Sequence, residues 1–390
     1  MTSDTGSGRD VIKASVAKLE HYILSKQFAG YDPYDALMSP LFQLPILRTA
    51  RFPRFAAQHL LRRLPLNIRP LLGIQKGRNP VTYGLCLQAF THLMAAFPER
   101  EEFYHDHALY CLGQLEQLQS KGYTGACWGY DFDWEARYAR MPAFTPTVVA
   151  TGIVTNALFE FYSATEDGRA FELCKSAARF VMNDLNKTEI GGTLCFSYSP
   201  LDRQRVINAT MKGARLLAQV YSVTRERRLI DDASRTVRFV LDNQNEEGSW
   251  PYSVGDTRTW VDNFHTGYVL DCLDEYVKWS GDRSVQASLD KGVQFYRDNF
   301  FQPDGTPKYY RDSVYPVDTT AASQSILTLA RFGFTDLAGE VALRTIQSMQ
   351  HDSGYFYYQR GRMFTNRISY MRWSNAWMLA GLASLLSVAR

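Results

Sequence analysis

Residues 248–268 read GSWPYSVGDTRTWVDNFHTGY, a stretch in which aromatic rings, glycines, acidic side chains and the imidazole of His265 lie close together. A buried segment would have to give each of these charged groups a partner away from water, which is costly. The mixture is instead typical of a loop that lines a cavity. That interpretation depends on whether similar stretches recur along the chain.

Similar aromatic stretches do recur, always between segments of helical periodicity. Apolar residues at three- and four-residue steps predict twelve helices in six pairs, at 9–27 with 79–97, 102–120 with 145–165, 168–186 with 203–224, 229–245 with 262–280, 283–300 with 318–333, and 335–350 with 367–389. The connectors inside the pairs are GYDPYD (30–35), CWGYDFDW (127–134), CFSYSP (195–200), GSWPYS (248–253), DGTPKYY (304–310) and DSGYFYY (352–358). From the second onward they begin 68, 53, 56 and 48 residues apart, a spacing suited to a helical hairpin plus a loop.

This pattern predicts an all-α fold, an (α/α)6 toroid of six helical hairpins. Stacked hairpins bring all six connectors to one end, which would form the active face. The second helices, such as DTTAASQSILTLA (318–330), are rich in small and apolar residues and are expected to form the inner ring. We expect Thr145, Asp262 and Asp318 to be N-caps, and one domain over residues 1–390 with a basic insert at about 40–78.

The charge of the chain is unevenly distributed. The net charge of +3 gives no general case for nucleic-acid binding, yet no acidic residue occurs from Ala36 to Pro98, where eight residues are Arg or Lys. The basic segment 48–78 is expected either to contact an anionic membrane surface or to form a solvated, internally paired face.

The remaining composition favours a cytoplasmic protein without metal or organic cofactor. The six cysteines lack metal-binding spacing and are expected to be reduced core residues. The stretch MTSDTGSGRD (1–10) has no apolar signal core, and no run approaches the roughly 18 apolar residues of a membrane span. Peripheral contact with the inner membrane follows if the basic segment binds lipid.

Six residues are candidates for acid–base catalysis. Asp262 and His265 are three apart at a helix start and so share a face, which Tyr268 extends. One of Asp131 and Asp133, in the connector at 127–134, is expected to face the cleft as a general acid. Asp318 is a further candidate acid. Capping is the alternative role for Asp262 and Asp318, and hydrogen bonding within the fold is the alternative for His265.

Aromatic and polar residues of the connectors are candidates for binding a sugar, because rings with polar edges suit its apolar faces and hydroxyl rims. The candidate rings are Trp128, Tyr130, Tyr198, Trp250, Tyr252, Tyr309, Tyr310, Tyr357 and Trp373. Asn208, Lys308 and Arg372 are candidates for gripping hydroxyls or carboxylates. Each ring taken alone is more often a packing residue, but together they favour a groove for a polysaccharide or oligosaccharide.

The order of these motifs resembles a family of helical-toroid proteins encoded with bacterial capsule and exopolysaccharide genes. The resemblance runs from about residue 20 to the end and rests on the connectors together with TPTVVATG (145–152), NAT (208–210), DNFHTGY (262–268), PVD (316–318) and YMRW (370–373). Six-hairpin glycosidases, including unsaturated glucuronyl hydrolases, and the helical domain of glucuronyl C5-epimerases are more distantly similar. The resemblance implies catalysis at the toroid mouth by aspartates, or by tyrosine and histidine. It carries over only to Asp262, His265 and Tyr268.

The leading hypothesis is a carbohydrate-active enzyme of polysaccharide biosynthesis that hydrolyses or modifies a glycan, including one with uronic acid. Uronate C5-epimerisation or lyase-type elimination by tyrosine and histidine is the alternative, with Asn208 and a sixth-loop arginine neutralising the sugar carboxylate. A non-catalytic glycan-binding scaffold is a different class. A terpene cyclase-like toroid is disfavoured, because the chain has no DxDD or DDxxD cluster.

Overall fold

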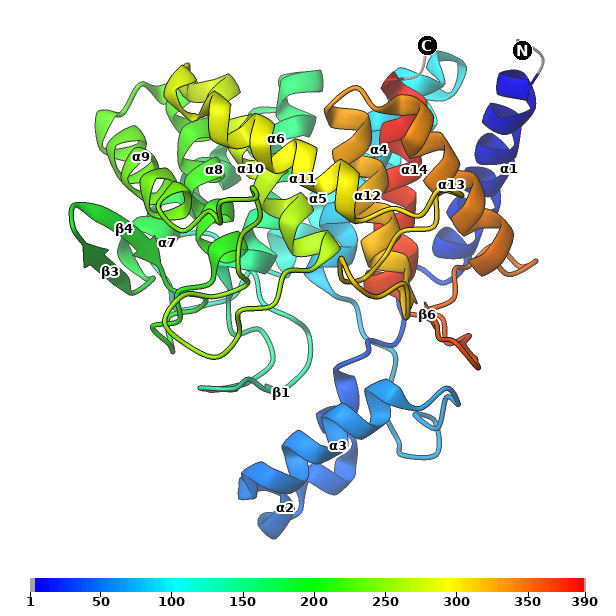
Figure 1. Cartoon of the computed structure of the whole chain (residues 1–390). Helices are drawn as coiled ribbons and strands as arrows, with labels where there is room; N and C mark the ends of the chain where they lie inside the picture. Colours follow the sequence, from blue (N-terminus) through cyan, green and yellow to red (C-terminus); the bar gives the residue numbers. More distant parts are fainter. Residues whose placement is uncertain (1–3, 389–390) are drawn as a thin grey trace.

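The structure, a computed structural model that describes residues 4–388, is a double ring of helices with long loops at one end (Figure 1). The inner helices are α4 (Pro80–Ala96), α6 (Val148–Thr165), α8 (Ile207–Thr224), α10 (Asn263–Ser280), α12 (Thr319–Arg331) and α14 (Trp377–Val388). The outer helices are α1 (Asp4–Ser25), α5 (Glu101–Gln117), α7 (Gly168–Asn183), α9 (Arg227–Leu241), α11 (Gln286–Asn299) and α13 (Thr335–Met349). Consecutive inner helices contact one another, and α14 contacts α4 and closes the ring. The predicted (α/α)6 toroid is confirmed.

The inner helices are buried on almost every side because their residues are small or apolar. All residues from 319 to 330 of α12 are buried. Helices α6 and α8 approach so closely that a Cβ on Gly152 would lie 2.5 Å from the Cβ of Lys212, so only glycine permits this packing. Outer helices bury a single stripe, as α9 does with Leu229, Ala233 and Val237. The inner helices are therefore buried on almost every side and the outer helices on one side, as the composition of the helices predicts.

Most inner helices begin at the loop end with a polar cap. Asn79, Thr147, Asp262 and Asp318 each accept a hydrogen bond from a backbone N–H of the first turn of α4, α6, α10 and α12. The caps predicted at Asp262 and Asp318 are confirmed. The cap predicted at Thr145 is wrong, because Pro146 pairs with Gly129 in a β-bridge and keeps the chain extended until Thr147.

The largest boundary difference lies at the last helix, which the sequence predicts from residue 367. Tyr370 instead pairs with Tyr31 in a parallel bridge, and a π-helical turn, η5 (Met371–Ala376), precedes α14. Short 3-10 turns η3 (Pro98–Arg100) and η4 (Arg283–Val285) lead into α5 and α11.

Short antiparallel strands stiffen the connectors. They are β1 (Trp134–Glu135) with β2 (Arg140–Met141), β3 (Lys187–Ile190) with β4 (Thr193–Phe196), and the sheet β5 (Val317–Asp318), β6 (Gln359–Arg360) and β7 (Thr365–Asn366). In the last sheet Asp318 lies opposite Gln359, and Gln359 lies opposite Asn366. This pairing joins the start of α12 to the sixth connector.

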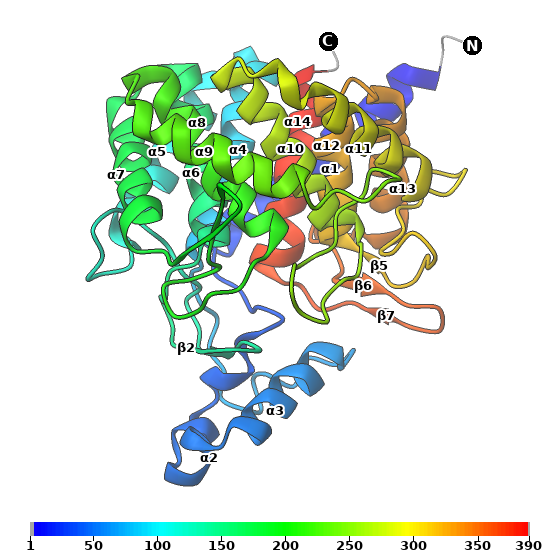
Figure 2. The same cartoon turned by 60° about the vertical axis from the view of Figure 1, so that its left-hand side comes forward.

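The basic insert lies outside the ring at the loop end (Figures 1 and 2). It contains η1 (Asp35–Met38), η2 (Pro40–Gln43), α2 (Pro45–Thr49) and α3 (Arg51–Arg63). A small apolar cluster of Ala36, Leu61 and Ile74 holds it together, separately from the main core. The Nε of Arg54 lies 2.5 Å from a carboxylate oxygen of Glu135, which ties α3 to β1.

All six cysteines are buried, as predicted, and none forms a disulfide within residues 4–388. In the same residues no group of His, Cys, Asp or Glu side chains is arranged to hold a metal ion. None of the described helices combines the length and the apolar character that a bilayer crossing requires.

Candidate functional site

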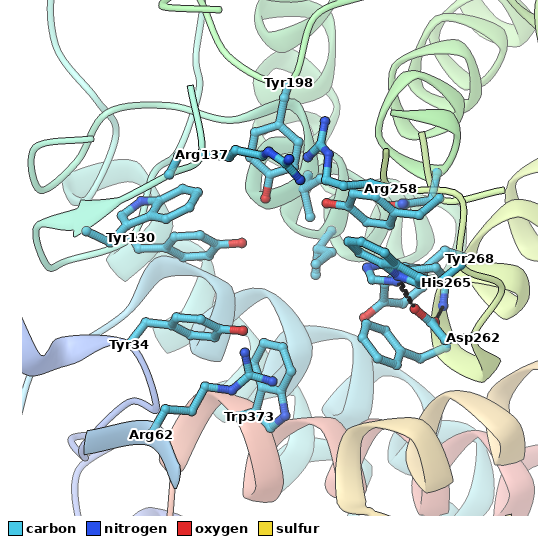
Figure 3. Close-up of a pocket in the computed structure, with 18 of the residues that line it drawn as sticks. Tyr34, Arg62, Tyr130, Arg137, Tyr198, Arg258, Asp262, His265, Tyr268 and Trp373 are labelled. Atoms are coloured by element: carbon cyan, nitrogen blue, oxygen red, sulfur yellow. Dashed lines mark hydrogen bonds and ion pairs between the residues drawn. The ribbon is translucent and has the colours of Figure 1, made fainter. Parts of the chain in front are cut away.

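The connectors meet around a cavity of about 340 Å³ at the loop end (Figure 3). Five of the six connectors supply rings to its wall, and η5 supplies Trp373 in place of the sixth. The aromatic wall consists of Tyr34, Tyr130, Phe132, Trp134, Tyr198, Tyr252, Trp260, Phe264, Tyr268, Tyr309, Tyr310, Trp373 and Trp377. The hydroxyls of Tyr34 and Tyr130 point across the cavity toward the side that carries His265. Such a wall offers both apolar faces and hydroxyl groups to a ligand.

Asp262 performs two tasks at the start of α10. One carboxylate oxygen accepts a hydrogen bond from the backbone N–H of His265 at 2.9 Å, which caps the helix. The other oxygen lies 2.7 Å from Nδ1 of His265 and 3.2 Å from the indole nitrogen of Trp260. Capping, the alternative predicted from the sequence, and orientation of the imidazole therefore coexist in one side chain.

The bond to Asp262 determines which nitrogen of His265 faces the ligand. An ionised carboxylate only accepts hydrogen bonds, so Nδ1 donates and carries the hydrogen of the neutral ring. Nε2 is then the acceptor, and no described residue forms a hydrogen bond with it. Because His265 lines the cavity, this arrangement presents a basic nitrogen to whatever the cavity holds.

Two tyrosines surround the imidazole. The ring of Tyr252 stacks on Trp260 at 4.8 Å and meets His265 edge-on at 4.7 Å, while the ring of Tyr268 lies 5.9 Å from His265. Burial raises the pKa of Tyr268 well above its ordinary value, and burial also raises the pKa of Tyr252. Both phenols therefore keep their protons near neutral pH and act as hydrogen-bond donors.

Four arginines line the cavity, and they differ in their partners. Arg258 binds Asp256 at 2.6 Å, and Arg372 binds both carboxylate oxygens of Asp32, at 2.6 and 2.9 Å. Arg62 donates to the hydroxyl of Tyr358 at 3.1 Å, and Arg137 donates to the hydroxyl of Thr257 at 3.0 Å. Within the described chain neither Arg62 nor Arg137 forms an ion pair, so both charges are available to an anion.

Eleven of the residues predicted from the sequence line the cavity. Three were predicted to be catalytic: Asp262, His265 and Tyr268. Eight were predicted to bind substrate: Tyr130, Tyr198, Asn208, Tyr252, Tyr309, Tyr310, Arg372 and Trp373. The structure brings them together, and their roles stay predictions. Asp32 already pairs with the guanidinium of Arg372. The expectation that an arginine of the sixth loop neutralises a sugar carboxylate stays a prediction.

Asp131 and Asp133 do not line the cavity. In an extended segment alternate residues share a face, and Tyr130, Phe132 and Trp134 take the inner one. Asp131 accepts a hydrogen bond from Asn79 at 2.6 Å, and burial raises its pKa to about 6. Asp133 accepts from the backbone of Ala143. The expectation that one of the two faces the cleft is therefore wrong, and neither is placed to act as a general acid in this cavity.

Asp318, Trp128 and Trp250 have roles in the fold. Asp318 caps α12 and accepts a hydrogen bond from Gln359 at 2.7 Å, outside the cavity wall. The two indoles are buried and donate to the carbonyls of Leu115 and Val240 near the ends of the preceding outer helices. The tryptophans thus anchor the second and fourth connectors, and the tyrosines two residues later reach the cavity.

Lys308 and Tyr357 also lie outside the cavity wall. Lys308 is half-buried and donates to the carbonyl of Arg311 at 3.0 Å. Tyr357 packs beside Tyr355, with the guanidinium of Arg367 5.4 Å from its ring centre. Tyr355 and Tyr357 of the sixth connector therefore pack outside the cavity.

Sequence reasoning missed the contribution of the insert. Arg62 lies in α3 and Tyr34 precedes η1, yet both line the cavity, with the guanidinium 4.9 Å from the phenol ring centre. Arg137 and Arg258 were missed as well. Only the position of Tyr34 in an aromatic connector signalled a place at the mouth, since α3 by itself has no local feature that directs Arg62 inward.

Solved structures match the chain closely in shape, whereas no protein-family model and no curated protein sequence matches it. Cellobiose 2-epimerase from Bacillus thermoamylovorans has a TM-score of 0.60 at 13% identity, over 80% of this chain and 87% of that one. A family 76 glycoside hydrolase from a bovine Bacteroides thetaiotaomicron strain has a TM-score of 0.61 at 13% identity, over 80% and 69%.

A possible member of the GH105 family from Salmonella enterica serovar Paratyphi A has a TM-score of 0.61 at 12% identity, over 97% of this chain and 94% of that one. The chain shares the (α/α)6 toroid fold of these structures. Identities this low establish the six-hairpin architecture and transfer no residue roles.

Proposed function

We propose that this six-hairpin protein is a carbohydrate-active enzyme that moves protons on an anionic glycan held in the aromatic cavity. The observation that carries the proposal is the Asp262–His265 pair, in which Asp262 engages Nδ1 and leaves Nε2 of the cavity-lining imidazole without a partner among the described residues. The named neighbours of the same fold are glycoside hydrolases and sugar epimerases, which supports a carbohydrate ligand. The resemblance of the motifs to capsule and exopolysaccharide proteins supports a setting in bacterial polysaccharide biosynthesis.

The number of carboxylates in the cavity favours proton transfer over ordinary glycoside hydrolysis. Hydrolysis generally uses two carboxyl groups on opposite sides of the scissile bond. Of the described residues that line the cavity, only Asp262 carries a carboxylate, and both its oxygens are engaged. A histidine base with a tyrosine acid fits uronate epimerisation or elimination, in which a carbon acid loses its proton.

Positive charge in the cavity favours an anionic sugar. Arg62 and Arg137 have no ionic partner in the part of the chain that the structure describes. The inner helices also begin at this end, so the positive ends of their dipoles face the cavity. The amide of Asn208, at the start of α8, lines the same space and is available for a hydroxyl or carboxylate. These groups suit the carboxylate of a uronic acid.

Side chains of this protein can accept and donate every proton that the proposed step moves. Nε2 of His265 takes the proton from the carbon next to the sugar carboxylate, and the electron pair moves into that carboxylate, which Arg62 and Arg137 stabilise. In epimerisation the hydroxyl of Tyr268 returns a proton to the opposite face of the carbon. In elimination the pair instead expels the neighbouring glycosidic oxygen, which takes the tyrosine proton and leaves a double bond in the sugar.

The test is incubation in deuterated water of the full-length protein with glucuronate- and mannuronate-containing oligosaccharides, with neutral mannan oligosaccharides for comparison. Deuterium at the carbon beside the carboxylate indicates epimerisation, and ultraviolet absorbance of a new conjugated double bond indicates elimination. New reducing ends without either signal would show hydrolysis and contradict the proton-transfer proposal. Saturable binding with no product would favour the glycan-binding scaffold.

A matched pair of variants isolates the role of His265. His265→Gln should lower turnover by at least about 100-fold and change the melting temperature little, because the ring is part-exposed and the general base is lost. His92, which pairs with Glu160 elsewhere in the toroid, supplies the control. His92→Gln should keep turnover within about twofold, since His92 lies outside the cavity. Equal losses in both variants would assign the effect to folding.

A further inference from the structure

Helix α3 of the insert buries two polar side chains beside Leu61 and exposes large apolar ones. The side toward the toroid buries Arg54 and Gln58, which bind Glu135 through its carboxylate and its backbone. The side away from the toroid exposes Phe52 and Leu60, with 81% and 64% of their surface accessible. A helix on a protein surface normally turns its apolar stripe inward. The outer face of α3 therefore lacks an apolar partner.

The exposed apolar surface extends over the whole insert. Nine of the 21 large apolar side chains that are exposed in the described residues lie between residues 38 and 71. They are Met38, Leu41, Leu44, Ile46, Phe52, Phe55, Leu60, Leu66 and Leu71, and we call them the apolar face of the insert. Single exposed apolar residues are common, but a concentration of this kind marks an interaction surface.

Charges of one sign surround the apolar face. The insert has no acidic residue after Asp35, and Arg48, Arg51, Arg63 and Lys76 are exposed around its helices. Apolar side chains ringed by cations match the chemistry of a bilayer interface with anionic headgroups, where the chains enter the lipid and the cations meet phosphates. None of the described helices is suited to crossing the bilayer, so the contact is at its surface.

We propose that the insert docks the protein on an anionic lipid bilayer through its apolar face. The α2–α3 hairpin projects from the loop end of the toroid, clear of the ring (Figures 1 and 2). Arg62 of the insert lines the cavity beside Tyr34 of the first connector, so docking places the cavity beside the bilayer surface. The proposal stands on exposure and charge and does not depend on the function proposed above.

The experiment is co-sedimentation of the full-length chain with vesicles of phosphatidylcholine alone and of phosphatidylcholine with phosphatidylglycerol. We expect binding to the anionic vesicles that weakens as salt rises, and little binding to the neutral ones. The variant Ile46→Ser/Phe52→Ser should weaken binding to anionic vesicles at least about tenfold, because two apolar side chains no longer enter the interface. Arg48→Gln/Arg63→Gln should weaken it by about tenfold at low salt.

Matched variants on the toroid control for general effects. Ile190→Ser/Val223→Ser removes exposed apolar groups and Arg227→Gln/Arg228→Gln removes exposed charges far along the chain from the insert, and both should bind as the unaltered protein does. Absence of vesicle binding, or equal effects of insert and control variants, would overturn the proposal. A dimer that Ile46→Ser/Phe52→Ser converts to monomer, without lipid binding, would overturn it in favour of contact between two copies.

Discussion

The ring contains two carboxylate–histidine pairs, and they lie in two different cavities. Asp262 and His265 lie at the loop end, and Glu160 and His92 line a second cavity of about 410 Å³ deeper in the ring. Ile153, Tyr268 and Trp377 line both cavities and so separate them. The two imidazoles are similarly exposed, at 23% and 26% of their side-chain surface. The exposure of the imidazoles therefore does not distinguish the pairs.

Their hydrogen bonds do distinguish them. Both ring nitrogens of His92 are engaged, with Ser387 at 3.1 Å and Glu160 at 3.2 Å. Glu160 also accepts hydrogen bonds from Gln88 and Asn156. His265 uses only Nδ1 within the protein. A pair in which both ring nitrogens already have protein partners has a role in the fold. A pair with one ring nitrogen free of protein partners can still bind a ligand.

The most heavily paired cation of the deeper cavity, Arg331, differs from two arginines of the loop-end cavity. In the deeper cavity Arg331 binds Asp274 at 3.0 Å and Glu275 at 2.6 Å, and lies 3.8 Å from Asp271. In the loop-end cavity Arg62 and Arg137 form no ion pair with any residue that the structure describes. We infer that the deeper network stabilises the ring and that the loop-end charges serve binding.

The largest effect expected from this comparison is the loss of stability in Arg331→Leu. The substitution leaves three carboxylates close together without their cation, which should cost about 3–5 kcal/mol of unfolding free energy. Urea denaturation measures it. The matched variant Arg62→Leu should cost less than about 1 kcal/mol, because no carboxylate of the described residues forms an ion pair with it. Similar losses in the two variants would remove the distinction between the cavities.

Acid stability tests the same network at Glu275. Burial acts to raise the pKa of this carboxyl, but Arg331 and the indole of Trp279 outweigh burial and hold the pKa at about 2. A carboxyl group whose pKa is lower in the folded than in the unfolded protein stabilises the fold at pH values above its unfolded pKa. This contribution of Glu275 is therefore lost as the pH falls from about 4.5 toward 2. The shift corresponds to about 3 kcal/mol. Glu275→Gln should flatten this part of the stability profile, and an unchanged profile would contradict the assignment.

A smaller effect is expected at the unpaired arginines. Arg62→Gln and Arg137→Gln should each weaken the binding of a uronate-containing oligosaccharide by about tenfold and leave a neutral one unaffected, because each removes a charge-assisted hydrogen bond. Isothermal titration against both ligands measures the difference. Arg258→Gln offers a useful contrast, since Asp256 occupies its guanidinium. Equal losses for charged and neutral ligands would show that the arginines only shape the wall.

The smallest effect is expected at Lys212, which lies at the boundary between the cavities. Its ammonium nitrogen is 3.7 Å from the ring centre of Tyr268, and burial lowers its pKa to about 8. Because the folded pKa lies below the unfolded one, the unaltered protein gains stability as the pH rises from about 8 toward 10. Lys212→Met should lose no more than about 1 kcal/mol of stability near neutral pH, because burial of the ammonium is itself unfavourable, and should lose this pH dependence. A loss above that range would indicate that the ammonium supports Tyr268 strongly.

Sequence reasoning predicted the parts of the site that depend on neighbouring residues. The helical periodicity of 262–280 and the spacing of Asp262, His265 and Tyr268 place three side chains on one face of α10 whatever surrounds them. A helix cap also depends only on residues close together in the chain, which explains why the caps at Asp262 and Asp318 were predictable. Thr145 was not, because its extended conformation depends on a bridge between Gly129 and Pro146.

The sequence by itself determined the ring of hairpins, the end at which its aromatic connectors gather and the helix start that carries Asp262 and His265. Only the tertiary structure decided that Trp128 anchors a connector while Tyr130 lines the cavity, that Asp131 turns away, and that Arg62 reaches in from the insert. The physical reason is the range of the interactions. Periodicity and capping act over a few residues, whereas the direction of a connector side chain depends on partners that are far away in the chain.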